Sequence, residues 1–312
     1  MKEKVLQNGR LLPAVEAALA ERYDLHPLWR ERDPAAFLAR RGGEFRGYIA
    51  SARYGADAAM MAALPNLRVI SIFGVGLDAV DLPAARSRGI AVGYTPDVLT
   101  DCVADTAMLL LLDVARGGTA ADRFVRRGDW ARGGQFPLST SVHGKQLGVL
   151  GLGRIGRAIA RRAEGFDMEI RYHNREPADL PYQYVASLRE LAQWADFLVV
   201  ASAGGAETRH LVSGAVLDAL GPQGFLVNIA RGSVVDEQAL LAALKQGRIA
   251  GAGLDVYEDE PNATPGLFEL ENVVLLPHVA SATTETRQAM GELSLENLDS
   301  FFRTGAVAVS AF

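Results

Sequence analysis

Cysteine is almost absent from the chain. Cys102 is the only cysteine among 312 residues, so no disulfide can form within the chain. A chain without internal disulfides is typical of a reducing compartment. The cysteine and the five histidines show no zinc-ligand spacing, and the N-terminal residues contain no apolar run like that of a signal peptide. We therefore expect a cytoplasmic protein that holds no metal.

Long hydrophobic runs and an excess of positive charge are missing as well. The longest apolar run, Ala107–Leu112, is stopped by Asp113 and falls far short of the roughly 20 residues that a membrane span requires. The chain has 32 basic and 37 acidic residues, a net charge of −5, which provides no electrostatic footprint for nucleic acid. We therefore expect neither a membrane nor a nucleic acid as partner.

What remains is an ordinary globular composition. Hydrophobic residues make up 49% of a chain that is long enough for about two domains at ~150 residues each. Short apolar runs typical of strands alternate with helical patterns along the whole chain. This alternation predicts an α/β architecture, in which helices cover both faces of a parallel sheet.

The predicted strands fall into two series. The first series comprises Lys4–Leu6, Tyr23–Leu28, Gly47–Ser51, Arg68–Phe73 and Ile90–Val92. The second comprises Gln146–Leu150, Met168–His173, Phe197–Val200, Phe225–Ile229, Gly251–Val256 and Val273–Leu276. These six strands would complete a doubly wound nucleotide-binding sheet. The helices expected between strands include Pro13–Ala20, Pro34–Arg40, Ala56–Leu64, Arg154–Glu164 and Glu237–Gln246.

Two long helical patterns, Val103–Ala115 and Thr284–Phe302, flank the second series and are expected to connect the two sheets. The sequence therefore predicts a discontinuous domain, residues 1–97 plus 285–312, and an inserted domain, residues 98–284. The predicted fold class is α/β with two doubly wound parallel-sheet domains. The discontinuous domain is expected to be flavodoxin-like and the inserted domain to be of the Rossmann type, which binds dinucleotides.

A glycine motif marks the start of the second series. The motif is Gly151-Leu152-Gly153-Arg154-Ile155-Gly156, which follows a predicted strand and opens a predicted helix. In this context a G-x-G-x-x-G indicates a dinucleotide-binding site. Gly151 permits the tight turn, Gly153 allows a pyrophosphate to approach the backbone, and Gly156 lets the helix pack on the strand. A tight turn without a ligand is the weaker alternative in this context.

The residues after the next strand indicate which dinucleotide binds. A carboxylate that would hold the ribose 2′-hydroxyl of NAD is missing, because this strand ends in His173-Asn174-Arg175. An arginine at this point can pair with a 2′-phosphate, so the sequence favours NADP over NAD. The alternative is that Arg175 is simply solvated.

Three side chains with complementary chemistry follow strands of the second series. Arg231, Glu260 and His278 are all expected at the sheet edge that carries the glycine motif. An arginine grips a carboxylate with its planar fork, a histidine exchanges a proton near neutral pH, and a glutamate beside it favours the imidazolium. Together with a nicotinamide, this set suits reduction of a 2-oxo acid.

Each of these residues also has a simpler interpretation. Arg231 and Glu260 are compatible with solvated loop positions, and His278 with a structural role after Pro277. All three residues are expected at one sheet edge beside a phosphate-binding motif. Because of this, the sequence favours a catalytic role over the simpler interpretations.

The residues together resemble the D-isomer-specific 2-hydroxyacid dehydrogenases over essentially the whole chain. The motifs that carry this resemblance are Gly74–Asp78, Gly151–Gly156, Asn228–Gly232, Gly253–Val256 and Pro277-His278. Thr95–Thr100, His173–Arg175, Thr208–Leu211 and Ser281–Arg287 are similar to the NADP-dependent glyoxylate/hydroxypyruvate reductase branch.

The resemblance implies roles for particular residues. It makes Arg231 the carboxylate-binding group, His278 the acid/base, Glu260 its partner, and Asp255 the group that holds the nicotinamide carboxamide. It places the backbone of Val75 and Gly76 against the substrate carboxylate. The cofactor-binding set becomes Gly151, Gly153, Arg154, Ile155, Gly156, Asn174, Arg175, Thr208, Ala230 and Asp255. The resemblance also makes the discontinuous domain the substrate (catalytic) domain and the inserted domain the dinucleotide-binding, or cofactor, domain. Relatives are usually homodimers through the cofactor domain and close a cleft between their domains.

Some points stay open at this stage. Three positions depart from the branch: Ser202-Ala203-Gly204-Gly205 lacks the usual proline before the two glycines, Asp167 replaces a usual glycine, and Cys102 a usual acidic residue. Arg53, in the predicted substrate domain, either adds a carboxylate contact or is solvated, and Trp130 either reaches a partner subunit's pocket or is packing. Rival functions are an aryl-pyruvate reductase, a formate- or phosphite-type member of the same fold, and a non-catalytic NAD(P)-sensing protein. Glu260 argues against formate chemistry.

Overall fold

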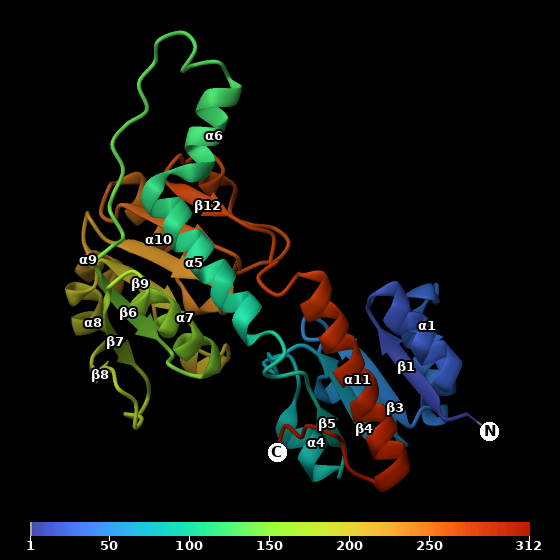
Figure 1. The fold of residues 1–312 in the computed structure, drawn as a ribbon. Helices are drawn as coiled ribbons and strands as arrows, with labels where there is room; N and C mark the ends of the chain where they lie inside the picture. The colour runs from blue at the N-terminus through green and yellow to red at the C-terminus, as the bar shows by residue number, and fades with distance from the viewer. Residues whose placement is uncertain (1) are drawn as a thin grey trace. The chain divides into compact units, whose positions relative to one another are not determined.

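The computed structural model describes residues 2–312, which form two compact units. The discontinuous unit consists of the chain up to Leu99 together with Ala282–Phe312, and the inserted unit is Thr100–Ser281. Figure 1 shows the chain entering the inserted unit at α5 and leaving it before α11. The sequence places the boundaries a few residues away, after 97 and 284. The substrate and cofactor roles of the units stay predictions.

The discontinuous unit is built on a five-stranded parallel sheet with the order β2-β1-β3-β4-β5. This is the flavodoxin-like order that the fold class predicts. The strands are β1 (Lys4–Asn8), β2 (Asp24–Pro27), β3 (Gly47–Ser51), β4 (Val69–Phe73) and β5 (Ala91–Gly93). The helices are α1 (Pro13–Arg22), α2 (Pro34–Arg41), α3 (Ala58–Ala63), α4 (Leu82–Ser87) and α11 (Thr284–Thr304).

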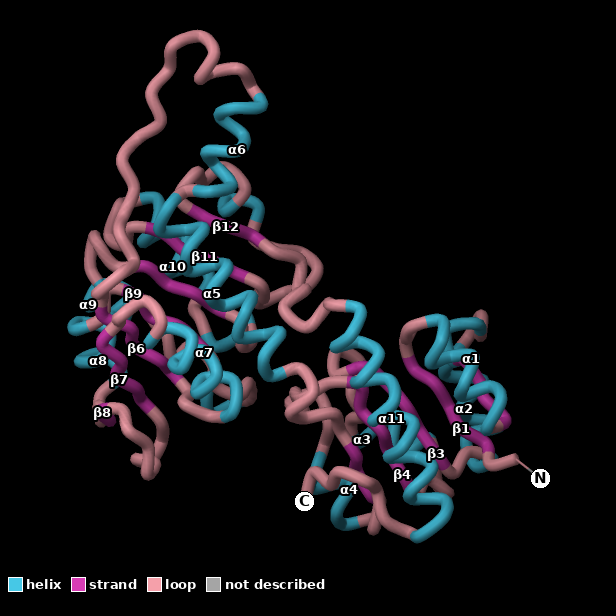
Figure 2. The backbone as a smooth tube through the Cα atoms, viewed as in Figure 1, coloured by secondary structure: helices cyan, strands magenta, loops and turns pink. Residues whose placement is uncertain are grey.

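Both faces of this sheet are covered, because successive side chains of a strand point to opposite faces. Val5 of β1 packs in a cluster with Leu19 of α1 and Leu298 of α11. Its neighbour Leu6 belongs to the other cluster, together with Met61 of α3. Figure 2 shows α11, the return of the chain, lying along this sheet. The unit therefore has a core on each side of the sheet.

The start of α3 differs from the sequence prediction. The sequence predicts a helix over Ala56–Leu64, but α3 begins at Ala58 because the side chain of Asp57 accepts a hydrogen bond of 2.7 Å from Met60 N. A side chain that caps the first amides in this way takes extended backbone angles itself, which places it outside the helix.

The inserted unit contains a seven-stranded parallel sheet with the order β12-β11-β10-β9-β6-β7-β8. The strands are β6 (Gln146–Leu150), β7 (Glu169–His173), β8 (Gln183–Tyr184), β9 (Phe197–Val200), β10 (Phe225–Asn228), β11 (Gly251–Leu254) and β12 (Val273–Leu275). The doubly wound class is confirmed. The expected number of six strands was wrong, since the two-residue edge strand β8 is too short to leave an alternating pattern.

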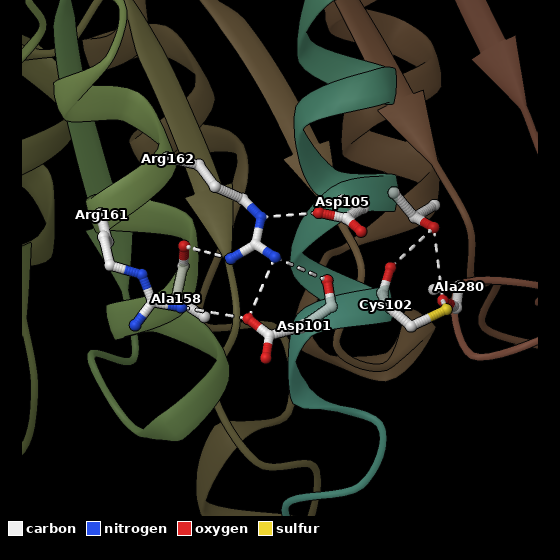
Figure 3. Close-up of polar contacts among 8 residues, drawn as sticks. Asp101, Cys102, Asp105, Ala158, Arg161, Arg162 and Ala280 are labelled. Atoms are coloured by element: carbon white, nitrogen blue, oxygen red, sulfur yellow. Dashed lines mark hydrogen bonds and ion pairs between the residues drawn. The ribbon is translucent and has the colours of Figure 1, made fainter. Parts of the chain in front are cut away.

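The helices of the inserted unit begin with the long α5. They are α5 (Thr100–Arg116), α6 (Gly118–Arg126), α7 (Arg154–Glu164), α8 (Leu188–Trp194), α9 (Gly214–Leu220) and α10 (Glu237–Lys245). Polar contacts join α5 to α7 (Figure 3): Arg162 donates to Asp105 at 2.7 Å and to Asp101 at 3.0 Å. The helix that follows the glycine motif is thereby held against the first turns of α5.

The direction of winding of this sheet reverses between β6 and β9, which are neighbours in it although β7 and β8 separate them in sequence. In open parallel sheets, ligands bind beyond the carboxyl ends of the strands at such a switch point. The glycine motif follows β6 directly, so it lies at this position.

The segment from α6 to β6 is the part of the inserted unit with the most exposed apolar side chains. Val125, Trp130 and Leu138 are 53%, 68% and 103% exposed. Figure 1 shows α6 and the segment after it lying away from the sheet. Trp130 is therefore not part of this chain's own core. Within residues 2–312, no helix is both long and apolar enough to cross a membrane.

Candidate active site

The glycine motif forms a turn whose backbone is open to an anion. Gly151 has φ +95°, and a Cβ there would lie 2.5 Å from Ser202 N. A Cβ on Gly156 would lie 2.2 Å from the carbonyl oxygen of Gly151, so both positions require glycine. Gly153 is different, because a Cβ there would enter open space, and no side chain caps the helix that it begins. Uncapped amides at a helix start fit a pyrophosphate.

The next loop braces this turn. The side-chain oxygen of Asn174 accepts a hydrogen bond of 2.8 Å from Leu152 N, inside the motif. Arg154 is the first residue of α7 and is exposed, Ile155 is half-buried, and Ala230 is buried with its N–H donated to Asn228. These residues fit a bound dinucleotide, and their contacts with it stay predictions.

Arg175 contacts an acidic residue from another loop. Its guanidinium lies 2.8 Å from a carboxylate oxygen of Glu207, and the two side chains are 88% and 79% exposed. Thr208, next along the chain, donates its hydroxyl to Gly205 O at 3.2 Å. No local pattern in the sequence indicates this role for Glu207, because its partner is 32 residues away.

The three residues with complementary chemistry lie on loops that follow three neighbouring strands. Arg231 follows β10, Glu260 follows β11 and His278 follows β12. The Nδ1 atom of His278 lies 2.7 Å from Oε2 of Glu260, whose other oxygen accepts a hydrogen bond of 3.2 Å from Tyr257 N. The His278 side chain is 43% exposed and that of Glu260 23%. The carboxylate thus fixes the ring, which leaves Nε2 as the nitrogen that meets a ligand.

The charge of Glu260 is stabilised by its surroundings. Burial raises the pKa of this carboxyl, but the hydrogen bond and the charge of His278 lower it. The N–H of Tyr257 and the charge of Arg231 lower the pKa further, so it lies below its ordinary value. The stability that this carboxylate contributes is present at neutral pH and is lost as the pH falls through the lowered pKa.

The backbone of His278 is strained and is held in place. Its φ is +54°, in the left-handed region, which costs a residue with a Cβ about 1–2 kcal/mol. The next two residues donate their N–H groups to the oxygens of Asp255, Val279 at 2.7 Å and Ala280 at 2.9 Å. Burial raises the pKa of Asp255, although these two N–H groups lower it.

The carbonyl of Ala280 is held from the opposite side. The thiol of Cys102 donates to it at 3.0 Å (Figure 3), and the hydroxyl of Thr106 at 3.3 Å. Asp255 and α5 therefore fix the segment directly after His278. The expectation that Asp255 also holds a nicotinamide carboxamide stays a prediction.

The discontinuous unit carries its own candidates at the carboxyl edge of its sheet. Arg53 lies in the turn after β3 and is exposed, while Val75 and Gly76 follow β4 and are half-buried. The two loops touch, because a Cβ on Gly74 would lie 2.6 Å from the Cβ of Ala52. Gly74 N also donates to the hydroxyl of Thr95 at 2.9 Å. Substrate binding by these residues stays a prediction.

Comparison with known proteins identifies the relatives of this chain. The family model described as "D-isomer specific 2-hydroxyacid dehydrogenase, NAD binding domain" matches residues 108–280. A glyoxylate/hydroxypyruvate reductase A of Arabidopsis thaliana is 47% identical over 289 residues, 92% of each chain.

The chain belongs to the D-isomer-specific 2-hydroxyacid dehydrogenase family.

Two further members of this family are informative. A hydroxyphenylpyruvate reductase of Plectranthus scutellarioides is also 47% identical over 289 residues, 92% of each chain. The crystal structure of an NADPH-dependent glyoxylate/hydroxypyruvate reductase from Sinorhizobium meliloti, in complex with NADP and malonate, is 43% identical with a TM-score of 0.92. That match covers 100% of this chain and 97% of that chain. The chain is thus an oxidoreductase of the 2-hydroxyacid dehydrogenase family with an NAD(P)-binding domain.

Proposed function

We propose that this 2-hydroxyacid dehydrogenase uses NADPH to reduce small 2-oxo acids, glyoxylate and hydroxypyruvate, to D-2-hydroxy acids. The observation that carries the proposal is the arrangement of Arg231, Glu260 and His278 on three neighbouring loops of the sheet that also carries the glycine motif. Relatives named as glyoxylate/hydroxypyruvate reductases support it.

Each of the three residues has one task. A bound nicotinamide supplies the hydride. Arg231 binds the substrate carboxylate through its planar fork and so orients the 2-oxo carbon. His278 donates the proton on Nε2 to the carbonyl oxygen, which becomes the hydroxyl of the product. Glu260 holds Nδ1 and stabilises the imidazolium before the proton leaves. Val75, Gly76 and Arg53 are proposed to assist in binding the substrate.

A second candidate substrate class is the aryl pyruvates. It is favoured by the relative named hydroxyphenylpyruvate reductase, which is as similar to this chain as the Arabidopsis protein. The experiment that separates the two classes is a steady-state panel with NADPH and glyoxylate, hydroxypyruvate, pyruvate and phenylpyruvate. A higher kcat/KM for the two small acids supports the proposal, and a higher value for phenylpyruvate replaces it with the second candidate.

NADPH is the proposed cofactor because Arg175 follows β7 where an NAD-binding sheet carries a carboxylate. Arg175→Ala is expected to lower kcat/KM for NADPH by about tenfold or more, since an arginine–phosphate contact is lost, and to leave that for NADH nearly unchanged. A 2′-phosphate must displace Glu207 from Arg175, so the matched variant Glu207→Gln is expected to lower KM for NADPH. Equal efficiency of the native enzyme with both cofactors contradicts this assignment.

We further propose a homodimer formed through the inserted unit, because α6 and the segment after it expose the apolar side chains of Val125, Trp130 and Leu138. The double variant Trp130→Glu, Leu138→Glu is expected to be monomeric in light scattering, whereas the native protein has twice the chain mass. Phe268 is 63% exposed elsewhere in this unit, and the control Phe268→Glu is expected to stay dimeric. A monomeric native protein contradicts the proposal.

A non-catalytic NAD(P)-sensing protein is the rival from another functional class. It requires a dinucleotide site but no proton donor. Tight NADPH binding without turnover on any 2-oxo acid would favour it, whereas turnover that depends on His278 excludes it.

A further inference from the structure

Glu237 is a buried carboxylate that the reaction above does not use. It is the first residue of α10 and only 5% of its surface is exposed. A buried carboxylate is costly unless hydrogen bonds satisfy it. The described contacts of its two oxygens come from a different loop: Glu258 N donates at 3.0 Å, Thr264 N donates at 3.1 Å, and the hydroxyl of Thr264 also donates.

The donors of these hydrogen bonds flank Glu260. Glu258 precedes it and Thr264 follows it, so the carboxylate of Glu237 binds both ends of the segment that carries the histidine's partner. A second contact fixes the same loop. A Cβ on Gly232 would lie 1.8 Å from the carbonyl carbon of Tyr257, so the backbone before Glu260 packs directly on the residue after Arg231.

A simpler role for Glu237 is stabilisation of its own helix. Acidic residues are common in the first turn, where they interact favourably with the helix dipole. Capping of α10, however, is done by the preceding residue, since the side chain of Asp236 accepts a hydrogen bond of 2.9 Å from Ala239 N. The two neighbouring carboxylates therefore have separate tasks: Asp236 caps the helix, and Glu237 reaches across to the loop of Glu260.

We propose that Glu237 is a positioning residue, which acts on the reaction by holding Glu260 within hydrogen-bond distance of His278. The proposal rests on the function proposed above. The contact that it protects is the 2.7 Å separation between Glu260 Oε2 and His278 Nδ1. If the loop loosens, the ring loses the partner that orients it and stabilises its charge, while the glycine motif, which follows a different strand, keeps its place.

The variant Glu237→Gln tests this idea with a nearly isosteric change. Its amide keeps one acceptor oxygen but turns an NH2 group toward an N–H donor, which breaks the three-bond arrangement. We expect kcat for hydroxypyruvate to fall by about tenfold to a hundredfold, as small displacements of catalytic groups do, with an unchanged Kd for NADPH. The pH dependence of kcat for this reduction should shift to lower pH, in the same direction as in Glu260→Gln.

A double-mutant cycle decides whether Glu237 acts through Glu260. In the Glu260→Gln background, Glu237→Gln is expected to lower kcat by less than about twofold, because the contact that it protects is already lost. An equal loss of kcat in both backgrounds, or native kcat in Glu237→Gln, overturns the proposal. If Glu237→Gln does not fold, Thr264→Val, which removes only the hydroxyl, takes its place in the same cycle.

The matched control is Asp236→Ala, which removes the cap of the same helix next to Glu237. It is expected to lower Tm and to keep the native pH profile and kcat. A shifted profile in Asp236→Ala counts against the proposal, because it would attribute the effect to helix stability. Failure of the proposed function is distinguishable, since the native enzyme would then show no 2-oxo acid reduction on which the cycle could be measured.

Discussion

Replacing His278 by asparagine is expected to lower kcat for hydroxypyruvate reduction by about 10²- to 10⁴-fold, the range that a lost general acid accounts for. The reason is that Nε2 of His278 is the proposed proton donor, and the side-chain amide of asparagine does not give up a proton near neutral pH. Steady-state consumption of NADPH measures the loss. A fluorescence titration with NADPH should give the native Kd, because the glycine motif lies on a different loop.

The choice of asparagine matters because His278 has φ +54°. Asparagine tolerates this left-handed conformation better than alanine does, so the variant removes the acid and adds little backbone strain. His278→Ala is the companion variant and should lose as much turnover with a lower Tm. Near-native kcat in both variants with every 2-oxo acid tried means that the proposed mechanism is wrong.

The second large effect is expected at Arg231. Arg231→Ala should lower kcat/KM for glyoxylate and hydroxypyruvate by about 10²- to 10³-fold, because two charge-assisted hydrogen bonds to the substrate carboxylate are lost. Arg231→Lys keeps the charge but loses the planar fork, so it should recover only part of the efficiency. Removal of the positive charge also raises the pKa of Glu260, since that charge contributes to lowering it.

NADPH binding is the control for Arg231. The variants should keep the native Kd for NADPH, measured by titration, and a circular dichroism spectrum like that of the native protein. Loss of substrate use and of NADPH binding together indicates misfolding. A native kcat/KM in Arg231→Ala contradicts the assigned role.

The sequence was informative where one residue pattern decides the local structure. The ranges of β3, β6 and β9 agree with their predicted ranges because each is a short apolar run between turn signals. The helix α6 was missed. Two glycines, which are poor helix formers, stand where it begins: Gly117 has φ +63°, and α6 starts directly after it at Gly118. The two-residue strand β8 is formed by pairing with β7, which no local pattern reveals.

The same distinction applies to the site. The grouping of Arg231, Glu260 and His278 was predictable, because the carboxyl ends of parallel strands share one edge of a sheet. The contacts that hold these residues were not. Asp255 accepts from residues 24 and 25 positions away, and Glu237 from residues 21 and 27 positions away. Such pairs carry no local signal, and only the assembled sheet brings them together.

The most direct test of the account is the fate of NADPH and hydroxypyruvate with the purified native enzyme. The account predicts that NADPH is consumed in equal amount to the 2-hydroxy acid formed, that the product is the D isomer on a chiral column, and that His278→Asn forms almost none of it. Tight binding of NADPH without product, or an L product, would contradict the account.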